Sequence, residues 1–144
     1  MIEKKKSVGA IIIKNNKYLL QKRDTKKKIF FPGFWGVFGG SVEKYETEKK
    51  AILRELNEEL SLKLKIKSKL FKLNFKSKFF KKERDRSYFQ CEFVGQKTKI
   101  KLNEGQKFGY FKIEELKKLN IIPWDLQAII YYDLFYVKKK KLIP

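Results

Sequence analysis

The sequence predicts an α/β fold, a three-layer α/β/α sandwich around a mixed β-sheet. Three observations support this prediction. Segments of β-branched and aromatic residues recur along the chain, a helical pattern interrupts them near the middle, and a second helical pattern follows them near the C-terminus. The 144 residues suit a single domain over 1–144, because a chain of this length can bury one hydrophobic core.

The first third of the chain predicts strands that lead to a pair of glycines. Asn15 and Asn16 favour a tight turn between two β-rich segments, so these segments are expected to form a β-hairpin. A strand followed by Gly39, Gly40 and a helix is a suitable frame for phosphate or metal chemistry. The expected elements are a strand at residues 7–13, a strand at residues 17–23, a loop at residues 24–33 and a short aromatic strand at residues 34–38.

The central helix is predicted over residues 47–60, with Thr47 near its start. Apolar side chains at helical spacing predict its buried face: Ile52, Leu53, Leu56 and Leu60. Each residue turns an α-helix by about 100°, so Glu55, Glu58 and Glu59 fall together on the adjoining face. One face of the helix is therefore core, and the next is a cluster of carboxylates.

The rest of the chain predicts further strands and a second long helix. Leucine and isoleucine alternate with lysine after the central helix, which is the period of a half-buried strand. Asp125 is expected to cap the last helix. The expected elements are strands at residues 62–75, 87–94, 97–102 and 108–112, a short helix at 113–119, a long helix at 125–137 that buries Leu126, Ile129, Ile130, Leu134 and Val137, and a frayed basic tail at 138–144.

The glutamate cluster predicts a site for a hard divalent cation. Adjoining carboxylates on one helix repel one another, so a positive group is expected among them. Arg54 can neutralise one of them, and magnesium, which prefers oxygen ligands, can take the rest. Manganese is an alternative to magnesium.

Composition excludes several other classes of protein. Cys91 is the single cysteine and histidine is absent, so zinc sites and Ser-His-Asp catalysis are not expected. The single cysteine is consistent with a cytoplasmic location. The sequence holds no run of eighteen apolar residues, so no membrane association is expected.

The formal charge of +20 has two readings. A positive field around an acidic site draws in polyphosphates, and it also favours non-specific contact with RNA. The alternative is that the lysines simply cover solvated strand faces and reflect a compositional habit. The sequence leaves both readings open, together with the question of whether the protein forms a homodimer.

Residues 40–62 resemble the Nudix box, a motif of fixed residues around one helix. The matching positions are Gly40, Glu46, Arg54, Glu55, Leu56, Glu58, Glu59 and Leu62. Three positions depart from the usual pattern: Phe38 where proline is frequent, Tyr45 where glycine is frequent, and Ser61 where the box ends in glycine. Serine at a helix end costs roughly 1 kcal/mol relative to glycine, so Ser61 bears on the stability of the helix end rather than on chemistry.

The resemblance implies a MutT-like enzyme with the Nudix fold and a role for each box residue. Glu58 and Glu59 are implied as metal ligands, together with a backbone carbonyl of Gly39 or Gly40. Glu55 is implied either as a ligand or as the base for the attacking water, with Arg54 holding it in place. Glu46 is expected to support the loop and helix. Further along the chain, Glu104 is a candidate for joining the site, or else a simple turn carboxylate.

Candidate substrate-binding residues precede the box. They are Arg23, Phe34 and Trp35, where the aromatic rings either stack on a nucleobase or pack in the core. Trp124 is expected to pack.

The resemblance implies hydrolysis of a nucleoside diphosphate linked to another group. Residues 75–79 hold neither the proline nor the tyrosine that mark the ADP-ribose and dinucleoside polyphosphate subgroups, and the coenzyme A signature is also missing. Nucleoside triphosphates or related nucleotides are therefore the leading small-molecule substrates. The alternatives are an RNA 5′-pyrophosphohydrolase and a non-catalytic nucleotide- or RNA-binding module.

Overall fold

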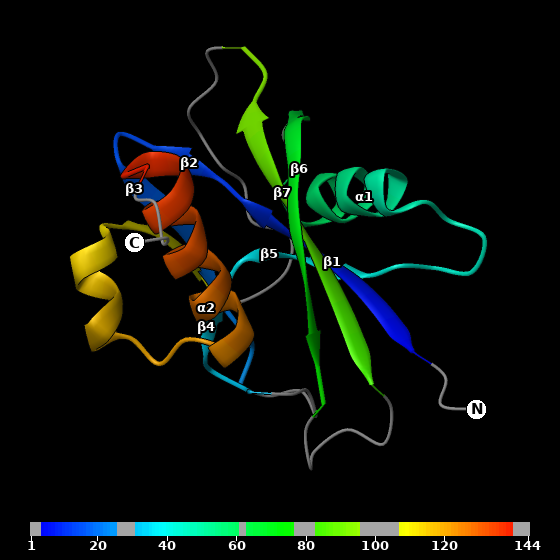
Figure 1. The fold of residues 1–144 in the computed structure, drawn as a ribbon, viewed down its shortest axis with the longest axis horizontal. Coiled ribbons are helices and arrows are strands. Elements are labelled where there is room, and N and C mark those ends of the chain that lie inside the picture. Colours follow the sequence, from blue (N-terminus) through cyan, green and yellow to red (C-terminus); the bar gives the residue numbers. More distant parts are fainter. Residues whose placement is uncertain (1–3, 26–30, 61–62, 77–82, 96–106, 140–144) are drawn as a thin grey trace, which may run out of the picture.

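The computed structural model describes residues 4–25, 31–60, 63–76, 83–95 and 107–139. Figure 1 shows a twisted sheet between two helices, with a second sheet packed beside it. The strands are β1 (Lys5–Ile11), β2 (Ile13–Lys14), β3 (Lys17–Lys22), β4 (Trp35–Gly36), β5 (Phe38–Ser41), β6 (Leu64–Phe75), β7 (Arg84–Phe93) and β8 (Lys107–Phe111). The helices are α1 (Glu48–Leu60), the 3₁₀-helix η1 (Ile113–Lys118), α2 (Pro123–Tyr132) and the π-helix η2 (Asp133–Val137).

The sheet between the helices is mixed, as predicted. Its strand order is β5-β1-β7-β6, in which β1 and β7 run parallel and the other neighbours run antiparallel. The second sheet is antiparallel, with the order β2-β3-β4 and with β8 paired to β3. The α/β/α sandwich is therefore confirmed, and a smaller sheet is added to it.

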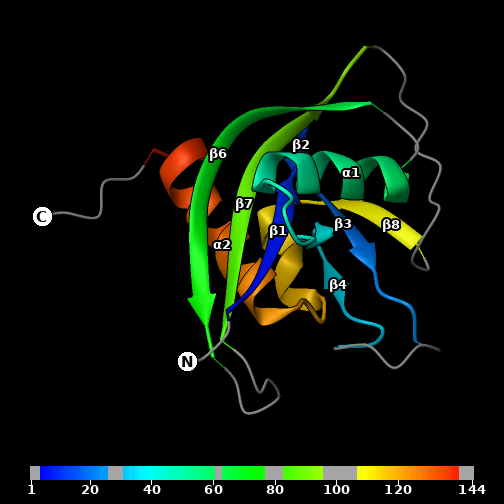
Figure 2. The same cartoon turned by 90° about the vertical axis from the view of Figure 1, so that its right-hand side faces the viewer.

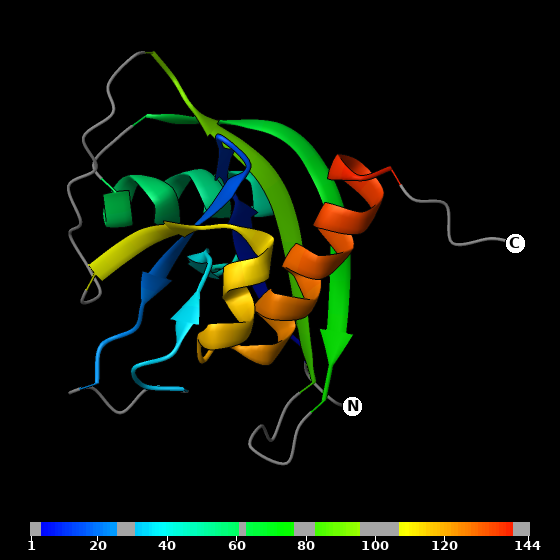
Figure 3. The ribbon, with the colours of Figure 1, turned by 90° about the vertical axis from the view of Figure 1, so that its left-hand side faces the viewer.

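The two helices cover opposite faces of the mixed sheet. Figure 2 shows α1 in front of this sheet, and Figure 3 shows α2 in front of its other face. Side chains alternate along a strand, so β1 sends Val8 and Ala10 into the core under α1 and Ile11 into the core under α2. On β7, Phe89 lies in the core under α1 and Tyr88 lies in the core under α2.

The predicted N-terminal hairpin is wrong in its first strand. β1 ends at Ile11 and lies in the mixed sheet, parallel to β7, and only the short β2 pairs with β3. The predicted turn itself is confirmed, since Asn15 and Asn16 adopt left-handed backbone conformations with φ of 52° and 60°. A parallel partner distant in sequence leaves no local signal, which explains the error.

The aromatic strand predicted at residues 34–38 is two strands. β4 belongs to the antiparallel sheet and β5 to the mixed sheet, and Val37 lies at the crossing between them. Gly39 and Gly40 lie inside β5 rather than after the strand. Where the chain changes sheets, Val37 donates its backbone N–H to the side chain of Asp125.

The last helix also differs from its prediction. α2 begins at Pro123, after Ile122 as the N-cap residue, and Asp125 is a buried side chain rather than a cap. Ile130 is exposed within α2 itself. In the widened turn of η2, Asp133 is buried and Val137 is exposed, contrary to the predicted apolar face. On α1, Leu53 is exposed as well, so the buried face of that helix is narrower than predicted.

Most other elements agree with their predictions within a few residues. They are α1, β6, β7, β8 and η1. The strand predicted at residues 97–102 lies outside the described residues. Across the described part of the chain, no helix has the length and apolar character needed to cross a membrane.

Candidate active site

The carboxylates of α1 meet the backbone of β5 at two glycines. A Cβ on Gly40 would overlap the carboxylate of Glu55, so glycine is required for this close approach. A Cβ on Gly39 would overlap the carbonyl oxygen of Val8 on the neighbouring strand, and Gly39 has a φ of +154°. The glycine pair therefore lets the helix carboxylate and the strand backbone come together.

Glu59 is the buried carboxylate of the cluster, with 4% of the residue exposed. Its Oε1 accepts a hydrogen bond of 3.1 Å from the backbone N–H of Gly39. Its Oε2 accepts a bond of 2.8 Å from Nε2 of Gln21 on β3. These two bonds orient a charged side chain that would otherwise be costly to bury.

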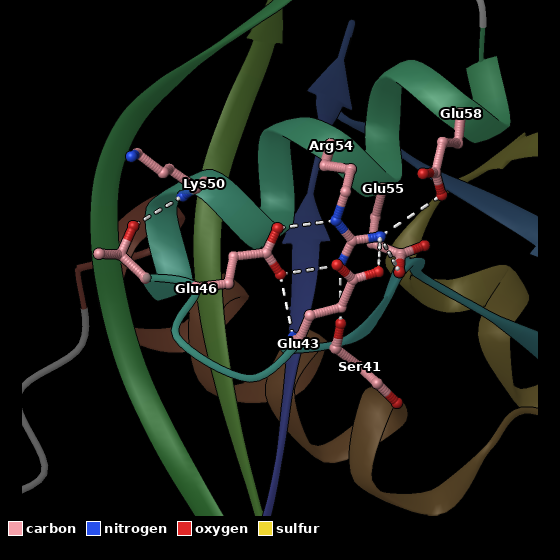
Figure 4. A network of polar contacts seen from close by, with 8 residues as sticks. Ser41, Glu43, Glu46, Lys50, Arg54, Glu55 and Glu58 are labelled. Atoms are coloured by element: carbon pink, nitrogen blue, oxygen red, sulfur yellow. Dashed lines mark hydrogen bonds and ion pairs between the residues drawn. The ribbon is translucent and has the colours of Figure 1, made fainter.

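Arg54 is the positive group that the sequence predicts among the glutamates. Its Nη1 donates to Glu55 at 3.0 Å and to Glu58 at 3.5 Å, and its Nη2 donates to the backbone oxygen of Ser41 at 3.0 Å. Figure 4 shows the guanidinium of Arg54 at the centre of this network, between α1 and the loop that precedes it. Hydrogen bonding to Glu46 is the main reason that the pKa of Arg54 is raised, so Arg54 stays charged.

Glu46 links the loop to the helix. Its carboxylate accepts two hydrogen bonds from Arg54, of 2.7 Å from Nε and 2.9 Å from Nη2, and one of 3.0 Å from the backbone N–H of Glu43. These bonds, first of all those from Arg54, lower the pKa of Glu46 to about 2. Thr47 follows and accepts the backbone N–H of Lys50, which is an N-cap hydrogen bond for α1.

A divalent metal fits the donor chemistry of this site. Within the part of the chain that the structure describes, no three acidic or cysteine side chains are grouped closely enough to hold an ion by themselves. The oxygens of Glu55 and Glu59 nevertheless lie at Gly40 and Gly39, and Glu58 is 49% exposed on the same helix. Carboxylate and backbone carbonyl oxygens are the ligands that magnesium and manganese prefer.

The candidate substrate-binding residues take different positions. Arg23 lies at the end of β3, donates its backbone N–H to Phe34, and has a buried Nε that no group in the described residues accepts. Burial, and then the charge of Arg86, lower its pKa. Trp35 is 9% exposed, belongs to the core under α2, and packs edge-on against Phe111 at 4.9 Å.

The other predicted residues are placed as follows. Leu56 lies in the core under α1, and Phe34 is half-buried beside the ring of Phe31. Trp124 packs on Phe75 with the two ring planes 12° apart. Glu104 and Ser61 lie outside the described residues.

Sequence reasoning missed Gln21, which orients Glu59, and Arg86. It placed Asp125 as a helix cap and so missed the buried ion pair that Asp125 forms with Arg86. Gln21 lies in β3, two residues before Arg23, but nothing in the sequence of a single strand shows which side chain will reach a helix distant in sequence. Buried polar residues leave no periodic signal of their own, because the hydrophobic pattern is formed by their neighbours.

Comparison with known proteins shows the family of this chain. The NUDIX domain family matches residues 3–132, which is most of the chain. The chain is 33% identical to a structure described as DNA mismatch repair protein MutT (family Nudix hydrolase) from Staphylococcus aureus, with a TM-score of 0.70 and coverage of 91% of this chain and 96% of the other. The chain therefore belongs to the NUDIX family, as the box motif predicts.

Two curated relatives match over shorter stretches. Nucleoside triphosphatase NudI of Enterobacter sp. (strain 638) is 42% identical over 59 residues, which are 41% of each protein. The 8-oxo-dGTP diphosphatase of Proteus vulgaris is 38% identical over 65 residues, which are 43% of this chain and 56% of that protein. The matched part therefore spans about half the length of these relatives.

Proposed function

We propose that the protein is a magnesium-dependent pyrophosphohydrolase that cleaves a nucleoside diphosphate linked to another group, with a nucleoside triphosphate as the leading substrate. The observation that carries this proposal is the approach of Glu55 and Glu59 on α1 to the Gly39–Gly40 backbone, beside the exposed Glu58. The relatives named as a nucleoside triphosphatase and an 8-oxo-dGTP diphosphatase support the substrate class. We further propose a cytoplasmic enzyme whose single domain spans residues 1–144.

The proposed roles follow from the contacts. Glu55, Glu58, Glu59 and a backbone carbonyl of Gly39 or Gly40 would hold the metal, with manganese as a substitute. When bound, the ion would supply charge stabilisation on the phosphates and acidify a water. Arg54 orients Glu55 through a 3.0 Å hydrogen bond, and Glu46 fixes Arg54.

The attacking water needs a carboxylate that accepts its proton. Glu55 is one candidate, because its oxygen lies at the glycine pair, and Glu104 is the other. Glu104→Gln should slow the chemical step with little change in KM if Glu104 is the base. A variant equal to the wild type at saturating magnesium would leave Glu55 with the role.

Arg23 is the proposed contact for a substrate phosphate. The side chain is half-buried directly after β3, and a guanidinium suits phosphate because it presents several N–H donors in one plane. Phe34 is half-buried and can contact a nucleobase. Trp35 is packed in the core, so its role would be to hold the neighbouring strand in place rather than to contact the substrate.

A panel of nucleotides tests the proposed function. The protein is incubated with each nucleotide and magnesium, and the release of phosphate or pyrophosphate is measured. Hydrolysis of at least one nucleoside triphosphate to the monophosphate and pyrophosphate is expected. Absence of hydrolysis across the panel, with magnesium and with manganese, would reject the proposal in favour of a binding module.

One surface favours the second candidate, an enzyme that acts on RNA 5′ ends. Tyr131 on α2 and Phe135 and Tyr136 on η2 are partly exposed, and Lys138 and Lys139 follow them. Exposed aromatic rings beside lysines suit single-stranded nucleic acid, because rings stack on bases and lysines contact phosphates. The same surface could instead contact a second copy of the chain, which a concentration series in sedimentation would reveal.

A further inference from the structure

A buried polar cluster lies beside the crossing between β4 and β5, just before the glycine pair in the chain. Asp125, in the first turn of α2, is 1% exposed. Its Oδ1 accepts hydrogen bonds from Nε of Arg86 at 3.0 Å and from the hydroxyl of Tyr88 at 2.7 Å. Its Oδ2 accepts the backbone N–H of Val37 at 3.1 Å. The carboxylate thus joins α2, β7 and the crossing between β4 and β5.

Two glycines make room for this cluster. A Cβ on Gly36 would lie 2.9 Å from Oδ2 of Asp125. A Cβ on Gly9 would lie 3.0 Å from Nη2 of Arg86 and 3.0 Å from Cε1 of Tyr88. A side chain at either position would contact the buried charged groups at less than a normal van der Waals distance. Glycine at these two strand positions therefore leaves space for the cluster.

A buried ion pair is a weak source of stability by itself. Removing two charges from water costs several kcal/mol, and well-packed apolar residues of similar volume are often as stable. Burial is the largest single influence on Arg86 and lowers its pKa, but the charges and hydrogen bonds of Asp125 and Tyr88 together raise the pKa above its ordinary value, so Arg86 stays charged. The distinctive feature of the cluster is its third bond, which goes to a backbone N–H.

The position of that backbone N–H connects the cluster to the site. Val37 lies between the two sheets, because β4 ends at Gly36 and β5 begins at Phe38. Two residues after Val37, Gly39 donates its N–H to Glu59, and Gly40 lies against Glu55. A change in the path of the chain at Val37 would therefore move both glycines relative to the carboxylates of α1.

We infer that Asp125 is a positioning residue, whose bond to the Val37 N–H sets Gly39 and Gly40 against the carboxylates of α1. This inference rests on the proposed function, because it assumes that these groups hold the metal. Asp125 contacts neither substrate nor metal in this role. It acts through the backbone, from a helix that begins more than eighty residues after the glycines.

The chain offers a matched control in Asp133. This carboxylate is also buried, lies just beyond α2 in η2, and accepts a hydrogen bond of 2.9 Å from the hydroxyl of Tyr18. Lys138 lies 3.2 Å from its other oxygen. Asp133 therefore matches Asp125 in burial and bonding type, but its bonds lead to β3 and the end of η2 rather than to the crossing.

The test compares Asp125→Asn with Asp133→Asn in three measurements. Amide hydrogen exchange reports the Val37 to Gly40 backbone, calorimetric titration reports Mn²⁺ affinity, and steady-state kinetics report kcat and KM. We expect Asp125→Asn to speed exchange at these amides, weaken Mn²⁺ binding several-fold, and lower kcat by about tenfold to a hundredfold with little change in KM. Asp133→Asn should lower only the melting temperature.

Two further variants are needed. One serves if Asp125→Asn does not fold, and the other distinguishes the Tyr88 hydrogen bond to Asp125 from the Val37 hydrogen bond. If Asp125→Asn does not fold, the double variant Asp125→Leu with Arg86→Met replaces the ion pair by apolar side chains and should retain a folded core. Tyr88→Phe removes one donor to Asp125 but leaves the Val37 bond, so it should leave kcat and Mn²⁺ affinity unchanged.

The inference is overturned if a folded Asp125 variant keeps the wild-type exchange rates at Val37 to Gly40, Mn²⁺ affinity and kcat. It is also overturned if Asp133→Asn alters these quantities equally, since the effect would then be general loss of stability. The exchange measurement needs no substrate. It therefore decides the inference even if the nucleotide panel rejects the proposed function.

Discussion

At the scale of residues, the guanidinium of Arg54 orients the carboxylates of the site. It gives two hydrogen bonds to Glu46 on the loop and others to Glu55 and Glu58 on its own helix. Its planar fork matches carboxylate geometry in a way that the point charge of lysine does not. Repulsion between the adjoining glutamates is thereby reduced, while the carboxylate of Glu55 remains at Gly40.

Glu58 and Glu59, the last two glutamates of the box, should be essential for turnover. Glu58→Gln and Glu59→Gln each remove one charged ligand, so kcat should fall about a hundredfold or more, because metal-assisted charge stabilisation is worth several kcal/mol. Steady-state kinetics at saturating magnesium measure the effect. Glu92→Gln is the control, since Glu92 lies on β7 and pairs with Lys65 at 2.9 Å. Near-normal activity of the Glu58 and Glu59 double variant would remove both from the site.

Glu46 should make stability depend on acid pH. Its pKa in the folded protein is about 2, below the ordinary value of 4.5, so the unfolded state binds more protons between these values. The stabilising contribution is therefore complete above about pH 4.5 and is lost as the pH falls toward 2. Glu46→Gln should have a lower melting temperature than the wild type at pH 7, and this difference should shrink on acidification. A difference that stays constant from pH 7 to pH 3 would contradict the assignment.

Tyr45 occupies a position where glycine would be more stable. Its φ is 65° and the residue is 95% exposed. A left-handed backbone costs an L-residue roughly 1 kcal/mol, and the exposed ring contributes little burial in return. Tyr45→Gly should be about 1 kcal/mol more stable than Tyr45→Ala in chemical denaturation, because alanine keeps the Cβ and loses only the ring. Equal stability of the two variants would show that the backbone there is not strained.

At the scale of elements, the site depends on the junction of β5 with α1. The helix carries the carboxylates and the strand supplies a backbone without Cβ atoms at the point of contact. The loop between them is fastened by Arg54, which also donates to the backbone oxygen of Ser41 at the end of β5. The same side chain that orients Glu55 therefore also fixes the position of α1 relative to β5.

Substitution of the two glycines should separate chemistry from folding. Gly40→Ala places a methyl group against the Glu55 carboxylate, which can move, so activity should fall at least tenfold while the protein stays folded. Gly39→Ala places a methyl group against the backbone oxygen of Val8 in the neighbouring strand, so it should lower stability by more than about 2 kcal/mol. Activity assays and urea denaturation of both variants measure this contrast. It fails if Gly40→Ala is fully active.

At the scale of the whole molecule, charge is distributed unevenly. The acidic site lies on a chain with a formal net charge of +20. A positive field of this kind raises the encounter rate with polyphosphates whether the substrate is a free nucleotide or an RNA end. The two substrates differ in how many phosphates the protein neutralises, and salt dependence reports that number.

Salt dependence should therefore distinguish the substrates. A free nucleotide contacts the pocket alone, so its kcat/KM should fall modestly between two salt concentrations, whereas 5′-triphosphorylated RNA across the exposed face of α2 and η2 should lose affinity steeply. Removing the rings with Tyr131→Ser and Phe135→Ser should weaken only the RNA. Faster processing of RNA ends than of any nucleotide at moderate salt would reverse the order of the two candidate substrates.

The sequence alone was sufficient for the class of fold, for α1 and for the presence of Arg54, Glu55, Glu58 and Glu59 on it, because periodicity and fixed spacing are local properties of one helix. Tertiary structure decided the pairing of β1 with β7, the division of residues 34–38 between two sheets, and the roles of Gln21, Arg86 and Asp125. Each of these depends on contacts between residues far apart in the chain. Asp125 illustrates the difference: in sequence it is a helix cap, and only the packing of α2 against β7 buries it beside Arg86 and the N–H of Val37.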